Sequence, residues 1–223
     1  MLWTCLLTVT LAADPTTMPL LNTLPEDGRW VRYDLRLQVG SQDHLLPYSV
    51  RSVGQFQQAG RDVRCIELDL TGNAEIPSML HRLLVPNDAF APEKFALGQA
   101  VRMWVRKGSD PVESFNDLTG DPLTMLFQAG ITQDLKKLET KETVNWQRGK
   151  LECTVFTGKS VQEIGTTKFN TESTILRHDD LPFGLAGLRM KLTPEGSTDV
   201  INVTLTLQDY GKDAKATLPE YTP

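Results

Sequence analysis

Alternation of apolar and polar side chains at every second position is the feature that most restricts how this chain can fold. The runs 30–39 and 201–208 both show it. Because successive side chains of a β-strand point to opposite faces, each run is predicted to be a strand with one buried and one hydrated face, as in antiparallel sheets. The side chains predicted to face inward are Val31, Tyr33, Leu35, Leu37, Ile201, Val203, Leu205 and Leu207.

Further runs with strand-like composition lie between these two, and turns that contain glycine separate many of them. They cover residues 46–56, 62–70, 80–85, 100–107, 151–157, 161–168, 172–178 and 186–193. About ten strands in succession predict a mainly β chain whose antiparallel sheet is curved or forms an incomplete barrel, with a sandwich as the alternative. No linker divides the chain, so a single domain is expected over 27–210, between an N-terminal extension (14–26) and a polar C-terminal tail (211–223).

One segment interrupts the strand pattern. Residues 121–130 begin with an Asp that suits an N-cap and a Pro that suits the first helical position, and they end in Gly. A second turn is expected over 132–138, so that the two form a short helical cover near 121–138 on the sheet. Leu123, Leu126 and Phe127 share one face of this cover. They are interpreted either as core residues or as ligand-binding residues of a lid over an apolar concavity.

The first thirteen residues are apolar and uncharged, and they end in Leu11-Ala12-Ala13 before Asp14-Pro15. Such a run is too short to cross a bilayer as a helix, and its small final residues suit a cleavage site. Residues 1–13 are therefore predicted to be a signal peptide, which would place the protein in the periplasm or outside the cell, without a transmembrane segment. The alternative is an ordinary buried strand, because no Lys or Arg precedes the apolar run.

Two of the three cysteines lie beyond the predicted signal peptide, Cys65 and Cys153, each within a strand-like run. An even number of cysteines in an exported protein permits one disulfide. The alternative is a pair of buried free thiols, because cysteine packs like a small apolar residue. Both interpretations stay open, since pairing depends on a Cα separation that a sequence does not contain.

Charge and motifs argue against several classes of function. The formal net charge is −5, which provides no long-range attraction for nucleic acid. The only phosphate-loop-like segment, Gly158-Lys159-Ser160, has Cys153 where the first glycine of that motif belongs. No GxSxG or HExxH pattern is present, and the three histidines are scattered. A non-catalytic protein without metal or cofactor is expected.

Tryptophans offer a further candidate for recognition. Trp104 shares the face of its predicted strand with Arg102 and Arg106, opposite Met103 and Val105. The side chain would either stack on a ligand such as a sugar or simply cover the sheet while arginine stems pack on it.

In layout, residues 27–210 resemble uncharacterised exported bacterial proteins and the LolA/LolB-like lipoprotein-carrier fold. The resemblance lies in the opening strand Asp27-Gly28-Arg29-Trp30-Val31-Arg32-Tyr33, the succession of strands, the mid-chain helical insertion and the segment Asp180-Leu181-Pro182-Phe183-Gly184-Leu185 before a late hairpin. It implies a half-barrel whose apolar concavity holds acyl chains, and it includes no diagnostic functional motif.

The resulting expectation is an exported, non-catalytic envelope protein that binds an apolar ligand or a lipoprotein acyl chain. One alternative is a structural or interaction protein with a filled core. The other is a hydrolase whose site has no recognisable motif.

Overall fold

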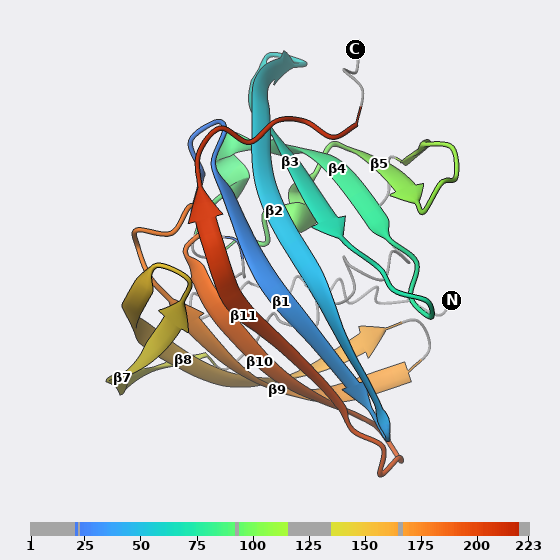
Figure 1. Ribbon diagram of the computed structural model, residues 1–223, viewed down its shortest axis with the longest axis vertical. Coiled ribbons are helices and arrows are strands. Elements are labelled where there is room, and N and C mark those ends of the chain that lie inside the picture. The colour runs from blue at the N-terminus through green and yellow to red at the C-terminus, as the bar shows by residue number, and fades with distance from the viewer. Residues whose placement is uncertain (1–20, 22, 92–93, 116–134, 165–166, 219–223) are drawn as a thin grey trace, which may run out of the picture.

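The computed structural model describes residues 21, 23–91, 94–115, 135–164 and 167–218. Within these residues, eleven antiparallel strands form one strongly curved sheet, and the helical elements are two 3-10 turns, η1 (Asn87–Ala89) and η2 (Leu97–Gln99) (Figure 1). The strands are β1 (Trp30–Val39), β2 (Gln42–Gln58), β3 (Arg61–Leu70), β4 (Met79–Pro86), β5 (Arg102–Lys107), β6 (Glu113–Phe115), β7 (Lys136–Trp146), β8 (Gly149–Ile164), β9 (Thr167–Arg177), β10 (Leu185–Pro194) and β11 (Ile201–Gly211).

The strand order is β6-β5-β4-β3-β2-β1-β11-β10-β9-β8-β7. Strands next to one another in the chain are therefore neighbours in the sheet, except for β6 and β7, and the first and last strands, β1 and β11, pair at its centre. The sheet stays open, because its edge strands β6 and β7 lie at opposite ends of the order. The predicted mainly β fold with a single curved antiparallel sheet is confirmed.

The two strands predicted most clearly from the alternation, β1 and β11, have the expected orientation. Tyr33, Leu35 and Leu205 are each 1–3% exposed, and Leu35 lies directly opposite Leu205. Val31, Val203 and Leu207 are buried as well, whereas Leu37 and Ile201 pack against the core from partly exposed positions. The face that carries these side chains is called the inner face below, and the opposite one the outer face.

The helical prediction is wrong for the end of its range. Lys136, Lys137 and Leu138 belong to strand β7, and the first two pair with Thr157 and Phe156 of β8. A hairpin to a sixteen-residue partner satisfies the backbone groups of this segment better than an isolated helical turn would, so tertiary pairing overrides the local preference. Residues 121–134, with Leu123, Leu126 and Phe127, lie outside the described residues.

A further difference concerns β8. The sequence predicts two separate strands over 151–157 and 161–168, but residues 149–164 form one continuous strand. Gly158 lies opposite Ser173 of β9 and does not break the ladder. The phosphate-loop-like segment therefore has extended backbone, which does not fit a loop that wraps a phosphate group.

Two segments fold back against the sheet, and the second of them lies on the outer face. The end of β7 folds back toward β11, where Trp146 stacks on Tyr210 at a centroid distance of 4.6 Å (Figure 1). Residues 212–218, called the C-terminal strap below, follow β11 and cross β2 toward β3 and β4, as the red end of the chain in Figure 1 shows. The strap begins with hydrogen bonds from Trp30 Nε1 to the Lys212 carbonyl and from the Ala214 N–H to Gly28.

The disulfide between Cys65 and Cys153 is not formed, and both cysteines are buried free thiols. Cys65 is on β3 and Cys153 on β8, which are six strand positions apart in the sheet and belong to separate apolar clusters. At about 4.8 Å per strand the separation along the sheet far exceeds the Cα distance that a disulfide spans. Burial raises the pKa of the Cys65 thiol to about 12 and that of Cys153 to about 11.

Candidate functional site

The outer face carries an apolar cavity of about 560 Å³ between the ends of β2, β3, β4 and β5 and the C-terminal strap. This volume falls within the range of small-molecule sites. The apolar part of its wall consists of Val53, Phe56, Cys65, Leu84, Trp104 and Ala216. Arg82 and Arg102 supply cationic groups in the same wall, so the cavity is an apolar pocket with polar groups at a few positions.

Strand register explains how these side chains meet. Cys65 lies opposite Leu84, and Leu84 lies opposite Arg102, so three neighbouring strands present one row to the pocket. The next row consists of Glu67, Arg82 and Trp104. Directly opposite residues in an antiparallel sheet point to the same face, which gathers the six side chains on the outer face.

A bulge in β2 places the aromatic wall of the pocket. The register with β3 shifts between Ser52 and Gln55, and Gly54 between them has a φ of 144°. A Cβ atom on residue 54 would lie 2.9 Å from the Phe56 ring, so glycine allows both the bulge and the close approach of that ring. Phe56 is 46% exposed and is available to a ligand.

Trp104 occupies the face predicted for it, since Met103 and Val105 belong to the main core and Trp104 does not. The side chain is nevertheless only 7% exposed, because it packs in a second apolar cluster with Leu80, Leu84 and the strap residue Leu218. The Arg102 guanidinium carbon lies 5.0 Å from the ring centroid. Cation–π stacking thus orients the arginine at the pocket.

The sequence interpretation missed this second cluster, although β4 contains a signal for it. All eight residues of Met79–Pro86 are buried, and apolar side chains occupy both faces of the strand. A strand buried on both faces has a nearly continuous apolar run in place of alternation. That pattern indicates a covering layer on each side of β4, but it does not say which segment supplies the outer layer.

A buried ion pair attaches the strap to the sheet. The fully buried Glu67 carboxylate accepts hydrogen bonds from Arg82 at 2.7 Å and from the N–H groups of Thr217 at 2.9 Å and Leu218 at 3.2 Å. Arg82 also donates to the Leu218 carbonyl at 2.6 Å. One carboxylate and one guanidinium therefore bind the strap backbone, and Ala216 of the strap becomes part of the pocket wall.

Two other tryptophans do not line this pocket. Trp30 stacks with Arg32, and Trp146 stacks with Arg148 and Tyr210. Among the described residues, no group of three or more His, Cys, Asp and Glu side chains is placed to hold a metal ion. No helix in the described part of the chain is long and apolar enough to cross a membrane.

Comparison with known proteins identifies no family. No family model matches the sequence, and no curated protein matches it. Among solved structures, the chain is similar to a crystal structure of a DUF1329 family protein from Desulfovibrio piger. The TM-score is 0.39 at 8% sequence identity, over 85% of this chain and 87% of that chain. A structural similarity this weak does not assign a function to any residue of this chain.

Proposed function

We propose that this protein is a non-catalytic binding module that holds a small amphipathic ligand in the apolar pocket of the outer face. The observation that carries the proposal is the combination of an aromatic and aliphatic wall, formed by Phe56, Leu84 and Trp104, with the Arg102 guanidinium stacked on Trp104. A ligand with an apolar body and an anionic head group matches this chemistry, because burial of apolar surface provides affinity and the cation provides orientation.

The pocket lies on the outer face, whereas the resemblance to the lipoprotein-carrier fold implies a ligand in the apolar concavity of a half-barrel. The inner faces of β1, β2 and β11 carry Tyr33, Tyr48 and Leu205, all of which are buried in the main core. On the outer face, by contrast, the half-exposed Phe56 leaves the pocket accessible from solvent. A fatty acid is the simplest ligand of the proposed class, and an acyl chain of a lipoprotein would present the same apolar group.

The first test is ligand binding by a variant of the pocket wall. Decanoate is expected to raise the Tm of the wild-type protein, because a ligand that binds only the native state at 100 times its Kd adds about 2.7 kcal/mol of stability. Phe56→Glu should weaken decanoate binding at least about tenfold, since it places a carboxylate in the apolar wall next to the bound chain. Titration calorimetry and thermal unfolding measure both effects.

Leu45→Glu is the matched control for Phe56→Glu. Leu45 is on the same strand, is 62% exposed and does not line the pocket, so the same charge change there should leave decanoate binding unchanged. Decanoate should also slow the reaction of Cys65 with a thiol reagent in a Cys5→Ser, Cys153→Ser background, because Cys65 lines the cavity. Equal binding by both Glu variants, or absence of a Tm shift, would contradict the proposal.

Export of the protein belongs to the same proposal, and it is supported by the apolar, uncharged residues 1–13 with their small final side chains. N-terminal sequencing of protein recovered from the producing cells is expected to begin near Asp14. A mature chain that begins at Met1 would show that this segment is not a cleaved signal.

A further inference from the structure

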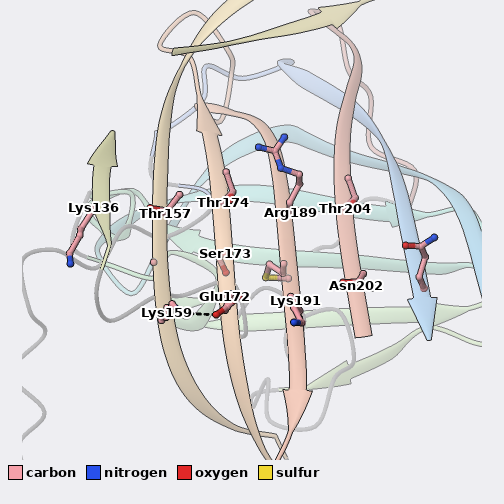
Figure 2. Close-up of a pocket in the computed structure, with 13 residues that line it drawn as sticks. Lys136, Thr157, Lys159, Glu172, Ser173, Thr174, Arg189, Lys191, Asn202 and Thr204 are labelled. Carbon is pink, nitrogen blue, oxygen red and sulfur yellow. Dashed lines mark hydrogen bonds and ion pairs between the residues drawn. The ribbon is translucent and has the colours of Figure 1, made fainter. Parts of the chain in front are cut away.

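A second hollow of about 800 Å³ lies on the other half of the outer face, across β8, β9, β10 and β11 (Figure 2). It shares no lining residue with the apolar pocket. Strand register arranges its side chains in two rows, and Figure 2 shows members of both rows on successive strands. One row contains Lys136, Thr157, Thr174, Arg189 and Thr204. The other contains Lys159, Glu172, Lys191, Asn202 and Gln38.

The spacing of this array follows from the geometry of a sheet. Neighbouring side chains in a row are about 4.8 Å apart, and the two rows are about 7 Å apart because they are separated by two residues along each strand. Hydroxyl, amide and cationic groups therefore face the hollow at regular intervals. We call these two rows and the hollow between and above them the polar trough.

The charge of the polar trough is opposite to that of the whole protein. Its lining contains four basic side chains, Lys136, Lys159, Arg189 and Lys191, and one acidic side chain, Glu172, in a chain with a net charge of −5. Arg189 pairs with Glu142 at 2.7 Å, and Lys159 pairs with Glu172 at 2.6 Å. Even with Lys136 left out of the count, the three cations Lys159, Arg189 and Lys191 face only the two carboxylates of Glu142 and Glu172. The local field is therefore positive, and a concave surface concentrates it.

The ion pairs in the polar trough do not prevent binding of an anion. The paired side chains of Lys159 and Glu172 are 75% and 54% exposed. Exposed pairs of this kind contribute little to stability, so a bound anionic group replaces them at small cost. Lys159 and Lys191 flank Glu172 on both sides in the same row, which places two cations within reach of one ligand group.

We propose that the polar trough binds an anionic oligosaccharide, such as a chain of uronic acids. The cations meet the acidic groups, while the threonine hydroxyls and the Asn202 and Gln38 amides donate and accept hydrogen bonds with sugar hydroxyls. A neutral sugar would leave the excess of cations unused. A lipid tail or an apolar peptide side chain would find almost no apolar partner, since Met190 is the single large apolar residue in the lining.

Titration calorimetry with oligogalacturonate tests the proposal, with maltohexaose as the neutral sugar and hexaglutamate as the acidic peptide. Oligogalacturonate is expected to bind, more weakly at high salt, because exposed charges are screened. Lys191→Glu should raise its Kd at least about tenfold, which corresponds to loss of about 1.4 kcal/mol. The control Lys107→Glu makes the same charge change on β5, far along the sheet, and should leave the Kd unchanged.

A second variant separates recognition of a sugar from simple charge attraction. Thr174→Val keeps the shape and charge of the trough and removes one hydroxyl, so it should weaken oligogalacturonate binding severalfold without altering binding of hexaglutamate. Circular dichroism confirms that each variant is folded. Equal or tighter binding of maltohexaose or hexaglutamate, or equal effects of Lys191→Glu and Lys107→Glu, would overturn the proposal.

Discussion

Replacement of Glu67 by alanine is expected to lower the free energy of unfolding by about 3–5 kcal/mol, the usual effect of breaking a buried ion pair from one side. The carboxylate is fully buried, and it accepts hydrogen bonds from Arg82 and from two N–H groups of the C-terminal strap. Its removal leaves a buried guanidinium without its carboxylate and leaves strap N–H groups without acceptors. Urea unfolding followed by circular dichroism measures the change.

Asp69→Ala is the matched control for Glu67→Ala. Asp69 is on the same strand and face, but its side chain is 32% exposed, whereas that of Glu67 is fully buried, and its ion pair with Arg51 is only partly buried. Loss of such a pair costs at most about 1 kcal/mol. If both variants lose the same small amount of stability, Glu67 does not anchor the strap.

The strap itself provides a second measurement on the Glu67 variant. Trypsin sites follow Lys212 and Lys215, which are within the strap, and cleavage requires the strap to leave the sheet. Limited proteolysis of Glu67→Ala should therefore remove the C-terminus well before the wild-type protein is cut there. Decanoate binding should weaken in parallel, because Ala216 of the strap is part of the apolar pocket.

The second large effect is expected at Leu205, where substitution by alanine should cost about 2–5 kcal/mol, as for other core leucines. Leu205 is 3% exposed and lies opposite Leu35 on one side and Leu188 on the other. A cavity at this position lies in the middle of the sheet, where strands on both sides limit its collapse. Chemical denaturation of the variant measures the loss.

Thr206→Ala is the control for Leu205→Ala. It places alanine at the next position of the same strand, so it measures the effect of alanine on strand propensity without removing a core side chain. Thr206 is exposed and faces the opposite side of β11, so its loss should change stability by no more than about 0.5 kcal/mol. A loss at Leu205 no larger than that at Thr206 would contradict the inward orientation of this strand.

These two substitutions differ in how far the sequence alone could have predicted them. Leu205 follows from alternation, because one hydrated and one buried face determine which residues of a strand point inward. Glu67 has no such signal, since a charged residue in a strand of mixed composition usually faces water. Its burial depends on Arg82, fifteen residues away, and on the strap, about 150 residues away in the chain.

The elements that the sequence interpretation missed have a common cause. Most residues of strand β7 are exposed, and its apolar and polar side chains do not alternate regularly. The sequence therefore indicates no buried strand face there, and residues 132–138 fit the pattern of a helical turn instead. Pairing with β8 decides its conformation, and that pairing is a contact between segments rather than a property of either. The continuous β8 has the same origin, because its ladder with β9 extends through Gly158.

By itself, the sequence determined the β class, the orientation of β1 and β11, and the face on which Trp104 lies, because side-chain alternation is a local consequence of strand geometry. Only the tertiary structure decided that the sheet stays open, that Cys65 and Cys153 remain apart, and that the strap closes an apolar pocket beside Trp104. Each of these depends on which strands are neighbours and on how the curved sheet brings distant segments together. Local periodicity contains neither kind of information.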